Sequence, residues 1–255
     1  MDVLLMTKEA KMFRFFDDRY THMPYAAHGS GTGCRLFCCI RDDNGKWKIH
    51  TFDGDWRRVK TGMPEDATEC SPFGEYDPNT RKWSVTFIAG GSETQGFMRF
   101  ALYRIPDLAH PKTERIVNAD AGYYWKDILF HAGRISGIDI EYGARRRHID
   151  IPEAEYIYRL TNNADDPAEL LVTGKRKDDS LFTLAINLRN QALDELEDGD
   201  SGEPLYKPCI IADEWFTAQR NGEFEERHIV RVRARRIPRR WEDIVITDER
   251  TEEED

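Results

Sequence analysis

The sequence predicts an all-β fold made of a series of small antiparallel sheets. Apolar and polar residues alternate along many short runs, which is the period of a half-buried strand and differs from that of a helix. Clusters of Gly, Pro, Asn and Asp separate these runs, and such residues favour tight turns. A convincing amphipathic helix is missing from the sequence, and a single helical turn is expected only at Ala192 to Leu196.

The chain opens with short strand-like segments and then reaches a clear hairpin. Apolar residues at 3–6 and 13–16 predict an opening pair of strands. Further on, predicted strands over residues 35–41 and 47–52 flank the sequence Asp43-Asn44-Gly45. Asn-Gly between two such runs is the strongest short-range signal for a β-hairpin.

A second sheet is predicted between Cys70 and Leu108. Trp83, Val85 and Phe87 alternate with polar residues, as expected of a strand with one buried face. The preceding Asp-Pro-Asn sequence at 77–79 favours a tight turn, because Pro fixes φ and the Asp and Asn side chains bond to nearby backbone. This stretch therefore predicts a strand, a turn, a strand, a loop and a third strand.

The pattern continues along the rest of the chain. Further strands are predicted at residues 115–117, 123–130, 135–142, 147–151, 156–160, 169–172, 209–211, 229–233 and 244–246. A turn over residues 174–180 and a long acidic loop over residues 194–203 interrupt them. Repeats of roughly 35–55 residues with three or four strands each are typical of the radial blades of a β-propeller. We therefore expect one β-propeller domain over residues 1–247, with about five blades and about four or six as the alternatives, and a disordered acidic tail over residues 248–255.

The charge of the chain disfavours nucleic acid as a ligand. The formal net charge is −10 at pH 7, which repels phosphates overall. Two arginine clusters, at residues 145–147 and 231–240, run against this trend. They would either contact an acidic partner or pair with nearby acids on a solvated outer face, and the second interpretation is favoured.

No motif in the sequence calls for a metal, a cofactor or a membrane. Five cysteines, at positions 34, 38, 39, 70 and 209, fit no zinc-ligand spacing and indicate reduced thiols. The glycine-rich residues 29–33 lack the Gly-Lys-Ser/Thr ending of a phosphate loop. Neither a secretory signal nor an apolar run of membrane-spanning length is found. We expect a cytoplasmic protein that uses no metal and no cofactor.

Residues 71–104 resemble one blade of a β-propeller, similar in style to propeller glycoside hydrolases and glycan-binding propellers. The matching motifs are Ser71-Pro72-Phe73, Trp83-Ser84-Val85-Thr86-Phe87 and Ala101-Leu102-Tyr103-Arg104. The resemblance implies a ligand site at one mouth of a central channel, where inner strands and the loops that feed them meet. The residues expected there are His28, Glu69, Ser71, Tyr124, Lys126 and Lys207.

Three functions are compatible with this pattern. The favoured hypothesis is a binding module for a glycan-like or other small polar ligand, or for a protein partner. The second is a propeller glycoside hydrolase, because the resemblance implies carboxylates facing one another across the channel. The candidate acids are Asp18, Glu69, Asp127 and Asp213. The third is a scaffold subunit of a larger assembly, such as a phage-encoded one, whose arginine face contacts an acidic neighbour. The oligomeric state stays open.

Overall fold

The all-β class is confirmed. Apart from one three-residue 3-10 helix, every regular element that the structure describes is a strand. The computed structural model describes the backbone of residues 2–6, 12–16, 25–29, 33–41, 47–52, 58–62, 69–77, 79–80, 82–94, 97–107, 109–110, 112–125, 128–132, 137–163, 166, 168–211, 214–220 and 226–250. Side chains are described for residues 79–80, 82, 84–88, 101–107, 109–110, 112–123, 128–132, 137–163, 166, 168–208, 210, 215–217 and 231–249.

The described strands form an N-terminal pair and five further antiparallel sheets. The pair is β1 (Asp2–Met6) with β2 (Met12–Phe16). Sheet 1 consists of β3 (Tyr25–Gly29), β4 (Gly33–Arg41), β5 (Trp47–Phe52) and β6 (Arg58–Gly62). Sheet 2 consists of β7 (Glu69–Asp77), β8 (Lys82–Thr94), β9 (Phe97–Ile105) and β10 (Glu114–Val117).

Sheets 3 and 4 each gain a fifth strand from the C-terminal part of the chain. Sheet 3 consists of β11 (Ala121–Trp125), β12 (Ile128–Ala132), β13 (Gly137–Tyr142), β14 (Arg145–Asp150) and β23 (Val245–Arg250). Sheet 4 consists of β15 (Ala154–Asn162), β16 (Glu169–Arg176), β17 (Leu181–Asn187), β18 (Ala192–Asp198) and β22 (Ala234–Arg239). Sheet 5 consists of β19 (Cys209–Ile211), β20 (Glu214–Arg220) and β21 (Glu226–Val232).

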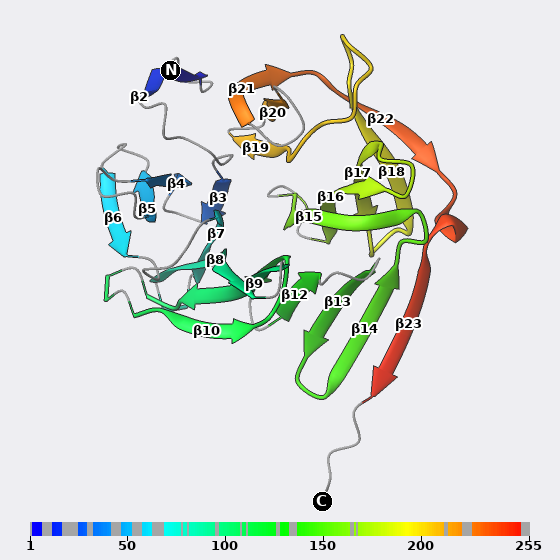
Figure 1. Cartoon of the computed structure of the whole chain (residues 1–255), viewed down its shortest axis with the longest axis horizontal. Helices are drawn as coiled ribbons and strands as arrows, with labels where there is room; N and C mark the ends of the chain where they lie inside the picture. Colours follow the sequence, from blue (N-terminus) through cyan, green and yellow to red (C-terminus); the bar gives the residue numbers. More distant parts are fainter. Residues whose placement is uncertain are drawn as a thin grey trace, which may run out of the picture.

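The five sheets follow one another in chain order around the centre of the molecule (Figure 1). The first strand of each sheet lies at one edge of that sheet, and these first strands contact one another. β3 contacts β7 and β19, and β11 contacts β7 and β15. Within the described residues, no strand pairing joins one of these sheets to the next. The closed propeller and its number of blades therefore stay predictions at this point.

Two predictions of local structure are wrong. Residues 192–196 form part of the strand β18 and no helical turn, and β18 continues to Asp198, so the expected long acidic loop is shorter than predicted. Residues 123–130, expected as one strand, belong to the antiparallel hairpin of β11 and β12. The reason for the first error is non-local, because β18 lies between β17 and the distant β22 and its backbone is paired on both sides.

The C-terminal segment crosses from one sheet to its neighbour. β22 covers the outer edge of sheet 4 beside β18, the 3-10 helix η1 (Trp241–Asp243) follows, and β23 covers the outer edge of sheet 3 beside β14 (Figure 1). β23 reaches Arg250, so the strand continues three residues beyond the predicted domain end at 247. Residues 251–255 of the predicted tail lie outside the described part of the chain.

The main apolar core lies where sheets 2, 3 and 4 face one another. Phe87, Tyr123, Phe130 and Phe182 are buried in it, and the Tyr123 and Phe130 rings stack with centroids 4.8 Å apart. A smaller cluster, containing Leu196, joins sheet 4 to sheet 5. The cores between successive sheets thus fix how each sheet is placed against the next.

Gly174 permits a close approach inside sheet 4. A Cβ atom at this position would lie 2.4 Å from the Tyr156 carbonyl oxygen and 2.6 Å from the Phe182 ring. A backbone oxygen cannot move away cheaply, so only glycine fits where β15 bulges against β16. In the described part of the chain, no helix is long and apolar enough to cross a membrane.

Candidate functional site

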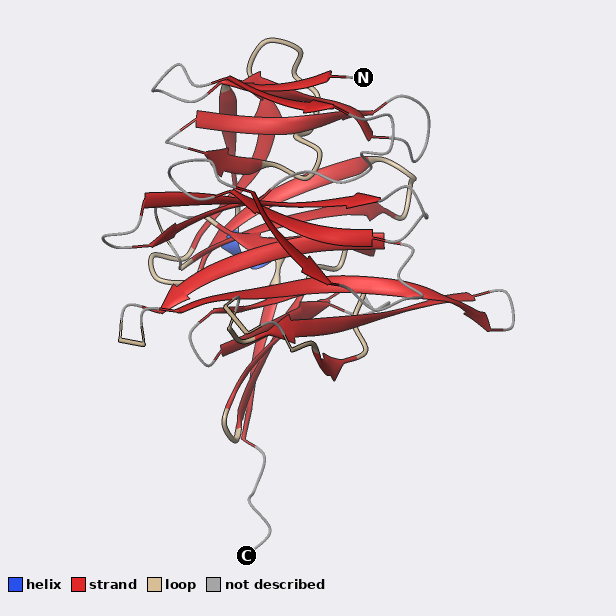
Figure 2. Ribbon diagram, turned by 90° about the vertical axis from the view of Figure 1, so that its left-hand side faces the viewer, coloured by secondary structure: helices blue, strands red, loops and turns tan. Residues whose placement is uncertain are grey.

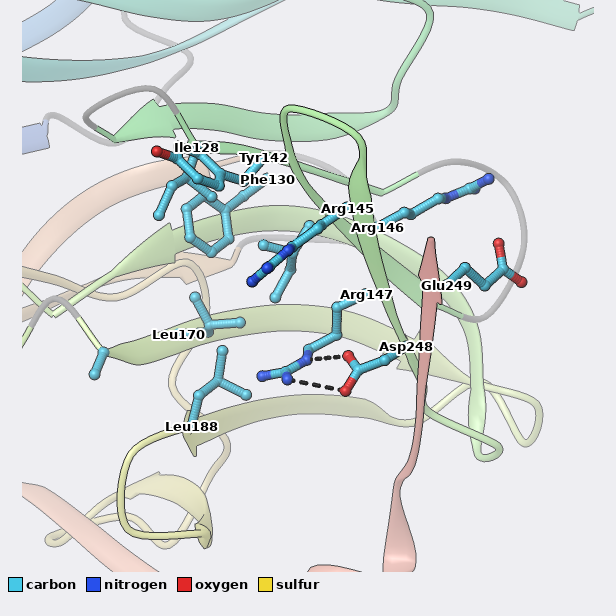
Figure 3. A pocket seen from close by; sticks show the side chains of 12 residues that line it. Ile128, Phe130, Tyr142, Arg145, Arg146, Arg147, Leu170, Leu188, Asp248 and Glu249 are labelled. Carbon is cyan, nitrogen blue, oxygen red and sulfur yellow. Dashed lines mark hydrogen bonds and ion pairs between the residues drawn. The ribbon is translucent and has the colours of Figure 1, made fainter. Parts of the chain in front are cut away.

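A cavity of about 610 Å³ opens between sheet 3 and one end of sheet 4 (Figure 3). Sheet 3 supplies the wall formed by β12, β13, β14 and β23, and sheet 4 supplies residues at the start of β16 and after β17. Its lining consists of Ile128, Phe130, Ile140, Tyr142, Arg145, Arg146, Arg147, Ala168, Leu170, Leu188, Asp248 and Glu249. Pockets for small ligands fall in this range of volume.

The wall changes from apolar to ionic along one row of directly opposed residues. Phe130 of β12 lies opposite Ile140 of β13, Ile140 lies opposite Arg147 of β14, and Arg147 lies opposite Asp248 of β23. All four side chains share one face of sheet 3, because directly opposed residues point to the same side. Leu170, fully buried on β16, closes the apolar end from the other sheet.

Arginines form the rim on β14. Arg145 and Arg147 point into the cavity, whereas Arg146 and the adjacent-strand Glu249 point away from it (Figure 3). The two-residue period of a strand explains this split. Tyr142 lies opposite Arg145 at the end of the β13–β14 hairpin and is 59 % exposed. The cavity mouth therefore carries an accessible aromatic ring next to guanidinium groups.

Only one of the two inward arginines is paired. Arg147 donates to Asp248 from Nε at 2.5 Å and from Nη2 at 3.1 Å. The hydrogen bond from Arg147 holds the pKa of Asp248 below its ordinary value, so this carboxylate stays ionised at neutral pH. Among the residues whose side chains the structure describes, Arg145 has no hydrogen-bond or ion-pair partner. The cavity thus holds an apolar floor, one neutralised guanidinium and one available guanidinium.

On the opposite face of β12, β13 and β14, polar side chains form hydrogen bonds and ion pairs with one another. Asp139 accepts hydrogen bonds from Arg146 and His148, at 3.1 and 2.9 Å. His131 Nε2 lies 3.1 Å from a carboxylate oxygen of Glu141. Asp139, Arg146, His131 and Glu141 on this face are therefore each paired with a side chain of the next strand, in contrast to Arg145.

The arginine cluster at 231–240 matches the favoured interpretation of a salt-bridged outer face. Arg236 donates two hydrogen bonds to the carboxylate of the buried Glu169, at 2.7 and 2.8 Å. Arg239 bonds to Glu153 at 2.5 Å and so ties β22 to the turn before β15. These arginines hold the C-terminal segment on sheet 4. The cluster at residues 145–147, in contrast, lies at the cavity.

Most of the sequence-predicted site residues lie beyond what the structure describes. The side chains of His28, Glu69, Ser71 and Tyr124 are outside the described set, although their backbones lie in the first strands β3, β7 and β11. Four further predicted residues are outside it altogether: Asp18, Lys126, Asp127 and Asp213. The placement of carboxylates across a channel therefore stays a prediction.

Lys207 is the predicted site residue whose side chain is described. Its Nζ lies 5.1 Å from the centre of the Tyr206 ring, and its carbonyl accepts a hydrogen bond from the buried Arg159 at 3.3 Å. The Tyr206 ring meets Tyr158 edge-on at 6.5 Å, and Tyr158 contacts Tyr156 at 5.1 Å. Lys207 thus belongs to a cluster of tyrosines between sheets 4 and 5, away from the cavity.

Sequence reasoning missed the cavity itself. The alternation of Arg145, Arg147 and Ile149 indicates that both arginines share the face of a buried residue, and that signal was available. Leu170 and Leu188 carried no comparable signal, because only the packing of sheet 4 against sheet 3 brings them to the same cavity.

Comparison with known proteins supplies no function for this site. No protein-family model, no curated protein and no solved structure is significantly similar to it. Within the described residues, no group of three or more His, Cys, Asp or Glu side chains could hold a metal ion.

Proposed function

We propose that this protein is a non-catalytic interaction module that binds an acidic, partly apolar segment of a protein partner in the cavity between sheets 3 and 4. The observation that carries this proposal is the combination of a buried apolar floor with the available guanidinium of Arg145 at its rim. An apolar side chain would occupy the floor beside Phe130, and a carboxylate would accept hydrogen bonds from Arg145.

Charge complementarity selects an anionic partner group. A cation in the cavity would face Arg145 and Arg147 at close range, and like charges at such a distance oppose binding. A purely apolar ligand would leave the Arg145 guanidinium partly desolvated and without a compensating bond. A carboxylate next to an apolar side chain satisfies both parts of the site.

Three features favour a protein segment over a free small molecule. The strands β13, β14 and β23 extend beyond the rest of the molecule, so the cavity wall stands clear of the body (Figure 2). Tyr142 is largely exposed at its mouth. Tyr and Arg are enriched among the residues that dominate protein interfaces. This proposal is nearest to the scaffold hypothesis, which places an arginine face against an acidic neighbour.

Binding to defined peptides tests the proposal. Acetylated and amidated extended peptides with one leucine and one glutamate on the same face should bind, and the lysine-for-glutamate version should not. Arg145→Glu should weaken binding by about tenfold or more, which corresponds to about 1.4 kcal/mol or more. Tyr142→Ala should weaken it by a smaller factor. Isothermal titration calorimetry measures both.

The matched control for net charge is Lys112→Glu. Lys112 is exposed and lies away from the cavity lining, and the substitution changes the charge by the same amount as Arg145→Glu. We expect Lys112→Glu to bind the peptides like the wild-type protein. Equal losses in the two variants, or peptide binding that is insensitive to the lysine replacement, would refute a specific site at Arg145.

We also propose that the five sheets are the blades of a five-bladed β-propeller. The support is their chain-order arrangement around the centre and the mutual contacts of the first strands β3, β7, β11, β15 and β19. β1 contacts β21, the last strand of sheet 5, so the N-terminal pair is placed to complete the fifth blade.

A second candidate function is the binding of a glycan-like ligand beside Lys207. The observation in its favour is the tyrosine cluster next to this lysine, since aromatic faces and cations suit sugar rings and hydroxyls. Tyr158→Ala should then weaken binding of any sugar found on a glycan array by about fivefold, or about 1 kcal/mol. An array with no binder, or a binder unaffected by this substitution, would remove the candidate.

A further inference from the structure

We propose that Asp248 occupies a second anion position of the cavity and so limits the partner to one acidic group. This inference rests on the proposed function of the same site. It concerns the selectivity of the site, to which the C-terminal strand β23 contributes a carboxylate 101 residues along the chain from the arginine that it neutralises.

Arg145 and Arg147 together form a pair of anion sites with a defined spacing. They are two residues apart on one strand and point to the same side, so their backbones are about 7 Å apart. Acidic residues at alternate positions of an extended partner segment have the same spacing. A segment with Leu-x-Glu-x-Glu order would place all three side chains on the face that enters the cavity.

Asp248 already supplies the anion at the Arg147 position. The two residues are directly opposed across β14 and β23, and both nitrogen–oxygen contacts lie within hydrogen-bond range. The side chain of Asp248 is 64 % exposed and that of Arg147 is 42 % exposed, so the pair faces solvent at the cavity rim and a partner carboxylate could reach it. A second acid of a partner would meet the Asp248 carboxylate instead of an available cation.

Glu249 provides a matched comparison. It is the next residue of the same strand and carries the same charge, but its side chain points away from the cavity (Figure 3). Removing the Glu249 charge changes the net charge of β23 without exposing Arg147. If peptide affinity changes in the Asp248 variant and not in the Glu249 variant, the cause is the Asp248–Arg147 pair and not the overall charge of β23.

The experiment measures the affinity of two peptides for four proteins by calorimetry. Both peptides are acetylated and amidated, one with the order Leu-x-Glu-x-Gln and one with Leu-x-Glu-x-Glu. The proteins are the wild type, Asp248→Asn, Glu249→Gln and the double variant Asp248→Asn with Arg147→Gln. We expect Asp248→Asn to bind the two-glutamate peptide about fivefold more tightly than the wild type does, and the one-glutamate peptide within about twofold.

The controls separate the inference from the proposed function. Glu249→Gln should give no selective gain for the two-glutamate peptide, and the double variant should lose the gain of Asp248→Asn. Peptides that bind the wild type through Arg145 but show no selective gain in Asp248→Asn overturn the inference alone. Peptides that bind none of the proteins overturn the proposed function together with the inference.

A spectroscopic measurement guards against a folding effect of the substitution. The thermal midpoint of Asp248→Asn is measured first, and the Nε–H resonance of Arg147 is then followed in peptide titrations. The two-glutamate peptide should move this resonance in Asp248→Asn and not in the wild type. A resonance that moves equally in both proteins shows that Asp248 does not occupy the position, and the inference fails.

Discussion

Buried threonine hydroxyls connect sheet 4 to the segment that leads into sheet 5. Thr183 is fully buried, donates to the carbonyl of Leu205 and lies 2.9 Å from the Thr173 hydroxyl. Thr217 accepts from the Tyr206 amide at 2.8 Å and donates to the Tyr206 carbonyl at 2.9 Å. Residues 205 and 206 are thus held from both sheets, and each hydroxyl satisfies backbone groups that have no strand partner.

Replacing Thr183 by valine tests the importance of this connection. The side chains have nearly the same shape, so the substitution removes the hydroxyl and leaves the Leu205 carbonyl without its donor. We expect the free energy of unfolding to fall by about 1–3 kcal/mol. Urea denaturation measures it, with the exposed Thr247→Val as the control. A loss no larger than that of the control would mean that the hydroxyl contributes nothing net.

At the scale of elements, the β13–β14 hairpin carries an ionic network on the face opposite the cavity. Burial alone would raise the pKa of Asp139, but hydrogen bonds from Arg146 and His148 outweigh it and lower the pKa. The network fixes the two strands to each other, and Arg146 is directly opposed to Glu141 within the hairpin. The rim arginines of the cavity depend on this hairpin for their position.

The lowered pKa of Asp139 predicts a pH dependence of stability. A carboxyl whose folded pKa is depressed contributes stability above its unfolded value, and this contribution is lost as pH falls through the folded pKa. Asp139→Asn should therefore be less stable than the wild type at pH 7, by about 1–3 kcal/mol. The difference should shrink below about pH 4. Thermal melting of both proteins from pH 7 to pH 2 measures this, and a difference that is constant with pH would contradict it.

At the scale of the whole molecule, the N-terminal pair contacts the last of the five sheets. β1 contacts β21 at one edge of sheet 5, and β3 contacts β19 at the other edge. An uncovered edge at β21 would expose unpaired backbone groups. The first strand of the chain therefore covers the edge of the last sheet to be synthesised.

Removal of residues 1–16 should destabilise the molecule more than the short length of this segment suggests. We expect the thermal midpoint to fall by about 5–10 °C, as for a loss of a few kcal/mol in a chain of this length, together with an increased tendency to self-associate through β21. Removal of residues 251–255 is the control and should leave the midpoint within about 1 °C. Similar midpoints for the two truncations would argue against a closed propeller.

The sequence predicted the strands best where the deciding signals are local. Turn chemistry and alternation predicted a turn at residues 77–79 between two strands, and the structure has a turn at Asn79 and Thr80 between β7 and β8. β18 was missed because Leu193 and Leu196 are spaced as in a helix, and because the acids Asp194 and Glu195 resemble a loop. In the structure, Arg236 of β22 donates a hydrogen bond to Asp194, and Arg239 of the same strand forms an ion pair with Glu195. The cavity was missed for the same reason, since its two walls belong to different sheets.

The C-terminal crossing determines when the proposed binding site is completed during synthesis. Asp248 can contact Arg147 only after the chain through β23 has left the ribosome, β22 has paired with β18 and β23 has paired with β14. In a nascent or shortened chain that lacks β23, the β14 edge would be unpaired, and the guanidinium groups of both Arg145 and Arg147 would be available to acidic segments. Under the proposed function, formation of β23 would therefore restrict the cavity to partners with one acidic group, and a molecule without β23 would also bind partners with two.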